Sequence, residues 1–259
     1  SKMGPILKVD NLSKVFLRGG QQPVTAVKNV SFELMPGECL GVLGESGSGK
    51  TTMVSMITRL LDVTVGQIIL DGQNITNLRG KELRSVYRKM QMVFQTPADS
   101  FDSRKTLGDG IGESLRNAGM SRRETRAEVE RLLEQCELSK KFADRYPHQV
   151  SGGQCQRAAI ARALAIQPKL LICDEATSAL DVTVQKEIID LLNQLRLAQG
   201  KHLSILFICH DLSLVQQFCD RVLVMYQGKI MEEGTPDAVI QTPKTEYTQM
   251  LVEAAMLGQ

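Results

Sequence analysis

The eight residues GESGSGKT at 44–51 constrain the fold of this chain more than any other stretch, because they match the pattern G-x-x-x-x-G-K-[ST]. The apolar segment ECLGVL precedes them, and the helical pattern TTMVSMITRLL begins at Thr51. In this order of strand, glycine-rich loop and helix, the loop N–H groups and the positive helix N-terminus converge on an anion. The motif therefore predicts a phosphate-binding loop inside an α/β fold.

Each residue type in this loop has an expected role when a nucleoside triphosphate such as ATP binds. Glycines let the backbone N–H groups turn towards phosphate oxygens. Lys50 should reach the β- and γ-phosphates, and the Thr51 hydroxyl should bind Mg²⁺. The residues expected to bind the nucleotide here are Gly44, Glu45, Ser46, Gly47, Ser48, Gly49, Lys50, Thr51 and Thr52.

Further short apolar segments alternate with helical patterns along the chain. They are ILKV at 6–9, QMVF at 91–94, KLLIC at 169–173, SILFIC at 204–209 and RVLVMYQGKI at 221–230. Near-continuous apolar strands separated by helices indicate a buried, mostly parallel sheet with helices on both faces. Two earlier segments, VSFEL at 30–34 and QIILDG at 67–72, alternate more and predict an antiparallel β subdomain.

The strand signal stops between residues 96 and 168, where helical spacing takes over. One predicted helix, at 124–138, carries an apolar face at spacings of three and four made of Val129, Leu132, Leu133 and Cys136. We therefore expect one domain over residues 1–259 with an inserted α-helical subdomain. Its expected parts are a core at about 6–95 and 169–233, the insertion at about 96–168, and a helical tail at 234–259 that begins at the turn Thr235-Pro236.

Composition excludes several classes of protein. Lysine and arginine number 31 against 29 acids, and only 4% of residues are aromatic, so the chain has neither the charge nor the stacking rings typical of a nucleic-acid binder. No apolar run reaches the length of a membrane span, about 18 residues, and no signal-peptide pattern opens the chain. The six cysteines lack metal-ligand spacing and are expected to be buried free thiols of a soluble, cytosol-like protein.

An acidic pair follows the apolar segment KLLIC and supplies what a phosphate loop needs besides itself. Asp174 should end a buried strand, where it can hold Mg²⁺ directly or through water. Glu175 should project towards the same site and is the candidate general base for the water that attacks the γ-phosphate. The alternative is that the two acids only cap the following turn.

Three other residues are candidates for the same site. His210 follows the apolar segment SILFIC and could hydrogen-bond the γ-phosphate, with Asp211 capping the next helix, although an isolated histidine is usually structural. Gln95 follows QMVF and could reach Mg²⁺ or the attacking water, but a glutamine after a strand says little by itself. Phe16 lies near the loop LRGGQQP and could stack on adenine or belong to the core.

A second glycine-rich sequence, VSGGQCQR at 150–157, precedes the helical run RAAIARALA. Ser151, Gly152 and Gly153 offer a hydroxyl and backbone N–H groups at a helix N-terminus, which predicts a second anion site. This second site lies at the end of the inserted helical segment, so it need not face the chain's own phosphate loop.

The motifs taken together, and their order, resemble those of ATP-binding cassette (ABC) ATPases. They are the loop at 44–51, Gln95, SGGQ at 151–154, LLICDE at 170–175, SALD at 178–181 and His210. The resemblance covers essentially residues 6–233, and its one departure, Val150 in place of the usual leucine, is conservative.

This resemblance implies an ATP hydrolase with a RecA-like, P-loop NTPase core that uses ATP and Mg²⁺. Two such subunits pair head to tail, so that Ser151, Gly152, Gly153 and Gln154 of one subunit close over ATP held by the other. Asp181 would couple the two sites. The second anion site thus belongs to the partner's nucleotide.

Finer motifs resemble the oligopeptide, dipeptide and nickel importer branch. VFQTPADSFDSRKTLGD at 93–109 is similar to its VFQ-x-P-x-x-S-x-x-P-R loop, except that Ser103 replaces a proline, and the tail at 243–248 is similar except that Thr-Glu replaces His-Pro. The absence of cysteine after Cys219 is typical of the shorter of two paired ATPases.

The resemblance also implies partners and a location. They are a second ABC ATPase subunit in a heterodimer or homodimer, two membrane permease subunits docked near 96–105, and indirectly an extracytoplasmic substrate-binding protein, at the cytoplasmic face of the inner membrane. By analogy within the family, the short tail favours nickel or another metal chelate as cargo, with di- or oligopeptides as the alternative. A non-transport ABC ATPase acting on nucleic acid or the ribosome, and a module that binds ATP without hydrolysis, are rival readings.

Overall fold

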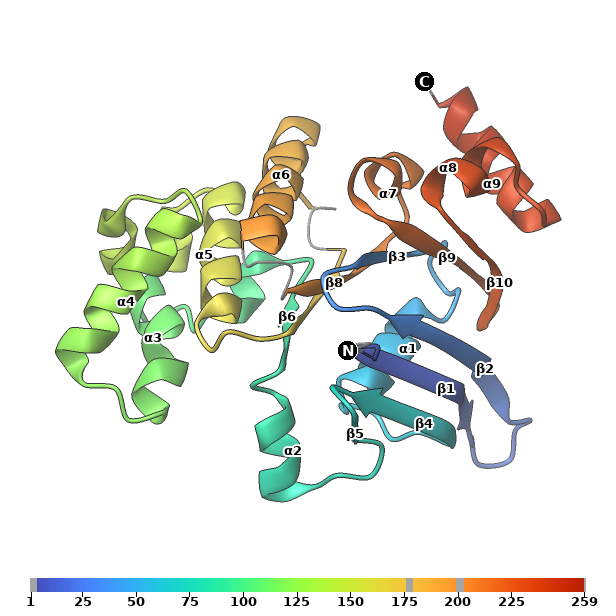
Figure 1. The fold of residues 1–259 in the computed structure, drawn as a ribbon, viewed down its shortest axis with the longest axis horizontal. Coiled ribbons are helices and arrows are strands. Elements are labelled where there is room, and N and C mark those ends of the chain that lie inside the picture. The colour runs from blue at the N-terminus through green and yellow to red at the C-terminus, as the bar shows by residue number, and fades with distance from the viewer. Residues whose placement is uncertain (1–3, 176–178, 199–202, 259) are drawn as a thin grey trace. The chain divides into compact units, whose positions relative to one another are not determined.

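The computed structural model describes residues 4–175, 179–198 and 203–258. The chain divides into two units, and each is described by itself: the first comprises residues 1–86 and 204–259, and the second residues 87–203 (Figure 1). Within the described residues, no helix combines the length and the apolarity needed to cross a membrane.

The first unit contains an antiparallel sheet with the strand order β2-β1-β4-β5. Its strands are β1 (Leu7–Phe16), β2 (Val24–Leu34), β4 (Val65–Leu70) and β5 (Gln73–Asn74). In β2 the buried residues Val30, Phe32 and Leu34 alternate with exposed ones, because successive side chains of a strand point to opposite faces. The predicted antiparallel β subdomain is confirmed.

The second sheet of the first unit is parallel around its central strand. Here β3 (Cys39–Leu43) pairs in parallel with β8 (Ser204–Cys209) and with β9 (Arg221–Tyr226), and β9 pairs antiparallel with β10 (Lys229–Gly234). The prediction of a single strand over 221–230 is wrong, because two strands, β9 and β10, occupy this segment. The chain reverses there because Gln227 and Gly228 both have positive φ, 48° and 79°, the conformation of a tight hairpin turn.

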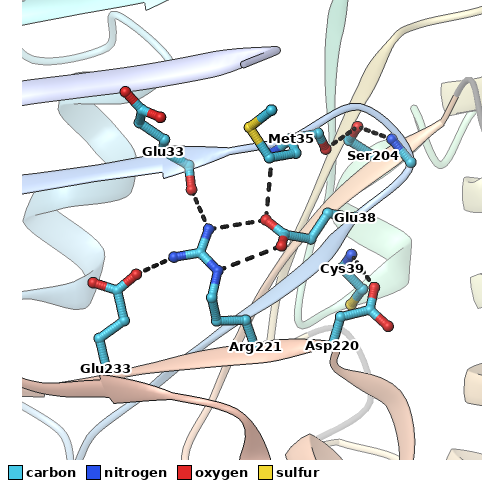
Figure 2. Close-up of polar contacts among 9 residues, drawn as sticks. Glu33, Met35, Glu38, Cys39, Ser204, Asp220, Arg221 and Glu233 are labelled. Atoms are coloured by element: carbon cyan, nitrogen blue, oxygen red, sulfur yellow. Dashed lines mark hydrogen bonds and ion pairs between the residues drawn. The ribbon is translucent and has the colours of Figure 1, made fainter. Parts of the chain in front are cut away.

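A polar cluster ties the strand starts of this sheet together (Figure 2). The Arg221 guanidinium lies between the carboxylates of Glu38 and Glu233, and its Nη2 donates to Glu38 Oε1 at 2.9 Å. Asp220 Oδ2 accepts the N–H of Cys39 at 2.9 Å. These bonds join the starts of β3 and β9, so the carboxyl ends of the two strands are held in register at the opposite edge.

Helices complete the first unit. They are α1 (Lys50–Ile57), α2 (Gly80–Val86), α7 (Leu212–Phe218), α8 (Pro236–Gln241) and α9 (Glu246–Leu257). Helices α8 and α9 lie within the predicted helical tail, side by side and next to β10 (Figure 1). The hydroxyls of Thr235 and Thr245 cap these two helices by accepting N–H groups of their first turns.

The second unit has a parallel strand pair, β6 (Met90–Val93) and β7 (Leu170–Asp174), and every regular element between the two is helical. Those elements are η1 (Pro97–Ser100), α3 (Leu107–Asn117), α4 (Arg122–Gln135), η2 (Lys140–Asp144), η3 (Pro147–Gln149) and α5 (Gly152–Leu164), and α6 (Val182–Ala198) comes after β7. The predicted apolar face of α4 is buried, as expected. A mixed α/β fold is thus confirmed.

The six cysteines are buried free thiols, which confirms the prediction. Burial raises the pKa of Cys136 to about 12 and that of Cys155 to about 11. Because the thiolate is the reactive form, these side chains are inert packing groups at neutral pH.

Candidate functional site

The phosphate-loop motif joins the end of β3 to the start of α1, as its sequence context predicts. Helix α1 begins at Lys50, directly after Gly49 with φ 100°. A Cβ at Gly49 would lie 2.9 Å from the carbonyl oxygen of Ala26 and 3.0 Å from Cα of Gly228, so no larger residue fits. Among the described residues no side chain caps this helix, and its first turn carries no acidic residue, so its positive N-terminus is left to the loop.

Lys50 is nearly buried, with 5% of its surface exposed. Its ammonium donates to the carbonyl oxygen of Gly44, where the loop begins, and to that of Cys209 at 3.0 Å, where β8 ends. These two carbonyls hold the cation where the loop begins, and a phosphate would bind it more strongly than a carbonyl because donor and acceptor would both be charged.

The Lys50 contact also brings the predicted residue His210 to the loop region. His210 directly follows Cys209, whose carbonyl accepts from Lys50, and its side chain is exposed. The next residue, Asp211, caps α7 as expected, because its Oδ1 accepts the N–H of Ser213 at 2.9 Å. Both ends of the Lys50 bridge therefore lie where parallel strands of the first unit terminate.

Three further residues predicted to bind the nucleotide or its ion, Ser48, Thr51 and Phe16, lie in the first unit. Ser48 Oγ is buried and has no hydrogen-bond partner among the described residues, which is an unmet polar group that a ligand can satisfy. Thr51 is exposed in the first turn of α1, so its hydroxyl is accessible to an ion. Phe16 ends β1 half-buried, with the Lys14 ammonium 5.4 Å from the ring centroid.

The acidic pair belongs to the second unit. Asp174 is the last residue of β7, and Glu175 follows with φ 49°, a conformation that is uncommon for a residue with a side chain. Gln95 comes two residues after the neighbouring strand β6 and is exposed. Because β6 and β7 pair in parallel with Val93 opposite Cys173, Gln95 and the acids lie at the same edge of the strand pair.

The oxygens of Thr51, in the first unit, and of Gln95 and Asp174, in the second, are of the type that Mg²⁺ binds. Mg²⁺ keeps several waters and takes one or two protein oxygens besides phosphates. No cluster of three or more His, Cys, Asp or Glu side chains occurs within the described residues, and such a cluster is not required for this ion. That Thr51, Gln95 and Asp174 hold the ion stays a prediction.

The SGGQ sequence forms the N-terminus of α5 with a reciprocal cap. Ser151 Oγ accepts the N–H of Gln154 at 3.2 Å, and Gln154 Oε1 accepts the N–H of Ser151 at 2.9 Å. This capping box uses the serine oxygen as an acceptor and leaves its proton to donate. The first turn of α5 is therefore held by a reciprocal cap, and its role as an anion site stays a prediction.

The glycines of SGGQ let the start of α6 approach closely. A Cβ at Gly153 would lie 2.7 Å from Cγ1 of Val184, and one at Gly152 3.2 Å from Cδ2 of Leu180. Asp181 caps α6, since its Oδ1 accepts the N–H of Val184 at 3.0 Å. The structure thus brings together SGGQ and Asp181, while Ser178 of SALD lies outside the described residues.

Two contributors to the loop were missed by sequence reasoning. Gly228, in the β9–β10 turn, donates its N–H to the carbonyl of Ser48 at 2.8 Å, and the Gln-Gly pair was the available turn signal. Tyr247, in α9, contacts the N–H of Glu45, and no local pattern indicates that contact.

Comparisons with known proteins agree with this geometry. Residues 27–178 match the family described as ABC transporter. The oligopeptide transport ATP-binding protein OppF of Streptococcus mutans is 44% identical over 251 residues, 96% of this chain and 81% of that protein. The glutathione import ATP-binding protein GsiA of Escherichia coli K12 is 44% identical over 262 residues, but the chain spans only 42% of its length.

Solved structures give the same result. CbiO1 from Clostridium perfringens, part of the transporter complex cbiONQ, has a TM-score of 0.82 at 27% identity, covering 98% of this chain and 99% of that one. The ATP-binding cassette MJ0796, in a dimer bound to ADP and Pi, has a TM-score of 0.79 at 32% identity, covering 89% and 98%. This chain belongs to the ABC transporter ATPase family, and its enzymatic activity is ATP hydrolysis.

Proposed function

We propose that this chain is the ATP-binding subunit of an importer for small peptides, in which the loop at 44–51 holds the triphosphate. The observation that carries the proposal is the Lys50 ammonium, held by the carbonyls of Gly44 and Cys209 at the mouth of the loop. Its relatives named for oligopeptide and glutathione import support a peptide cargo. Nickel, which the sequence favoured, has no such support among these relatives.

The proposed roles within one nucleotide site follow from the chemistry of each predicted residue. Lys50 moves from its two carbonyl acceptors to the β- and γ-phosphates when ATP enters. Glu175 accepts the proton of the attacking water, which Gln95 orients, and His210 donates a hydrogen bond to the γ-phosphate. Phe16 stacks on the adenine. Thr51, Gln95 and Asp174 are the proposed ligands of Mg²⁺, which would supply positive charge against the charge that develops on the phosphates.

The second anion site acts on a partner subunit's ATP. The fixed N-terminus of α5 offers N–H groups and the Ser151 proton to the γ-phosphate across a head-to-tail dimer. Asp181 caps α6 directly beside Gly152 and Gly153, so a movement at one nucleotide reaches the other site through this packed contact. Closure on ATP and reopening after hydrolysis then form a rigid-body switch.

The assembly in which this cycle works is a transporter. We propose that the partner is a second ABC ATPase, in a heterodimer or a homodimer, and that two membrane permeases dock near residues 96–105, which contain η1. An extracytoplasmic binding protein delivers the cargo to the permeases. The chain then lies peripherally at the cytoplasmic face of the membrane.

Uptake by cells that lack this gene tests the proposed cargo. Labelled dipeptides, oligopeptides, glutathione and nickel are offered to cells that carry the wild-type gene, the Glu175→Gln variant or no copy. The proposal predicts that peptide uptake is lost without the gene and restored by wild type alone. Loss of nickel uptake alone would contradict the peptide cargo, and unchanged uptake of all four would contradict a role in import.

A further inference from the structure

The C-terminal helix α9 touches the phosphate loop through one side chain. Tyr247, in the first turn of α9, is 7% exposed, and its hydroxyl oxygen accepts the backbone N–H of Glu45 at 3.4 Å. Glu45 is the second residue of the loop at 44–51. A residue about 200 positions later in the chain therefore satisfies a backbone donor of the loop.

The Tyr247 ring is held on the same strand end that supports the loop. It stacks on Tyr226, the last residue of β9, with ring centroids 4.3 Å apart and planes inclined by 26°. The carbonyl oxygen of the preceding residue, Met225, lies only 2.7 Å from where a Cβ of Gly44 would be. The end of β9 thus contacts the first residue of the loop and also positions the ring that reaches the second.

The start of α9 is anchored independently of this stack. Glu232 of β10 is 8% exposed and accepts the N–H groups of Lys244 and Thr245 at 3.0 Å, and the Thr245 hydroxyl at 3.2 Å. Burial opposes ionisation of Glu232, but these donors outweigh it and hold its pKa below the usual value. The carboxylate is therefore charged at neutral pH, and it fixes the helix start two residues before Tyr247.

The contact with Tyr247 gives the Glu45 N–H a different partner from the one proposed for the other N–H groups of the loop. The Glu45 N–H donates to the buried phenol of Tyr247, so the protein itself satisfies this donor. Burial raises the pKa of Tyr247, so the phenol stays neutral and does not place a negative charge beside the phosphate site. Phosphate oxygens are left to the later amides of the loop and to the first turn of α1.

We propose that Tyr247 is a positioning residue for the phosphate loop, which makes the α8–α9 hairpin a determinant of nucleotide affinity. The inference rests on the proposed role of the loop at 44–51 in ATP binding. Tyr247 touches no substrate; it fixes the backbone at Glu45, so that the amides that follow are preorganised for phosphate oxygens. Without that bond the loop would have to be ordered when the nucleotide binds, at a cost in affinity.

Tyr247→Phe tests the proposal because it removes one oxygen and keeps the ring on Tyr226. The Kd for ATP should rise roughly two- to tenfold, the range that corresponds to one net hydrogen bond. Hydrogen exchange at the Glu45 amide, followed by NMR, should accelerate while the amides of α9 keep their protection. Tyr226→Phe is the matched control, since it removes the hydroxyl of the other ring and should change neither quantity.

The outcomes separate this inference from the function on which it rests. If wild type binds ATP and Lys50→Ala does not, but Tyr247→Phe binds like wild type with unchanged Glu45 exchange, Tyr247 is only structural and the proposal fails. Weakened binding accompanied by faster exchange throughout α9 also refutes it, because the helix rather than the bond was lost. If Lys50→Ala binds ATP as tightly as wild type, the proposed role of the loop fails, and the inference fails with it.

Discussion

Gly49→Ala should destabilise the chain by more than the loss of a flexible residue alone. The left-handed backbone at φ 100° costs an ordinary L-residue about 1–2 kcal/mol. The added Cβ would also lie 2.9 Å from the Ala26 oxygen and 3.0 Å from Gly228 Cα, and such overpacking costs about 1–3 kcal/mol more. The sum, about 2–5 kcal/mol, corresponds to a fall in Tm of roughly 4–20 °C for a chain of this size.

Gly47→Ala separates the two contributions. Gly47 also has positive φ, 83°, but no atom of the described residues lies within 4 Å of its added Cβ, so only the backbone cost of about 1–2 kcal/mol applies. Thermal and urea unfolding of both variants give the comparison. Equal losses of stability would refute the argument that the contact with Ala26 and Gly228 makes glycine obligatory at position 49.

Two further predictions concern the anchors of α9 and α5. Because the pKa of Glu232 is lowered in the folded chain, its stabilisation should be complete above its unfolded value of 4.5 and should be lost as the pH falls through the folded value. Glu232→Gln should therefore be less stable than wild type by about 1.5–3 kcal/mol at pH 7, with a gap that closes in acid; a gap independent of pH in urea titrations would contradict this. Ser151→Arg should leave ATP binding by this chain intact and abolish turnover in the dimer, measured by phosphate release. Loss of the chain's own ATP binding would instead place Ser151 at its own site.

Local patterns predicted the elements that carry the site. The apolar segments at 38–43 and 204–209 became β3 and β8, because a fully buried strand requires a continuous apolar run. The segment at 221–230 misled because its apolar content continues across the Gln227-Gly228 turn, which only the glycine marks. The backbone conformation of Gln227 and Gly228 ends the strand there, although the apolar residues continue.

Contacts between neighbouring residues can be predicted from sequence, but contacts between distant segments cannot. The spacing of Ser151 and Gln154 matches a capping box, so that cap was readable from sequence. The bond from Glu45 to Tyr247 joins residues about 200 positions apart, and it depends on how α9 docks beside β10. The backbone carbonyls that accept from Lys50 could not be predicted from sequence either, because every residue has a carbonyl.

The size of the Glu175→Gln variant with and without ATP tests most directly whether two chains share each nucleotide. Removal of the proposed general base should leave ATP bound and trap the closed pair, so gel filtration with light scattering should show a dimer only when ATP is present. Adding Ser151→Arg to the same chain should return it to a monomer that still holds ATP. A Glu175→Gln chain that binds ATP and remains a monomer at every concentration tested would contradict the head-to-tail account.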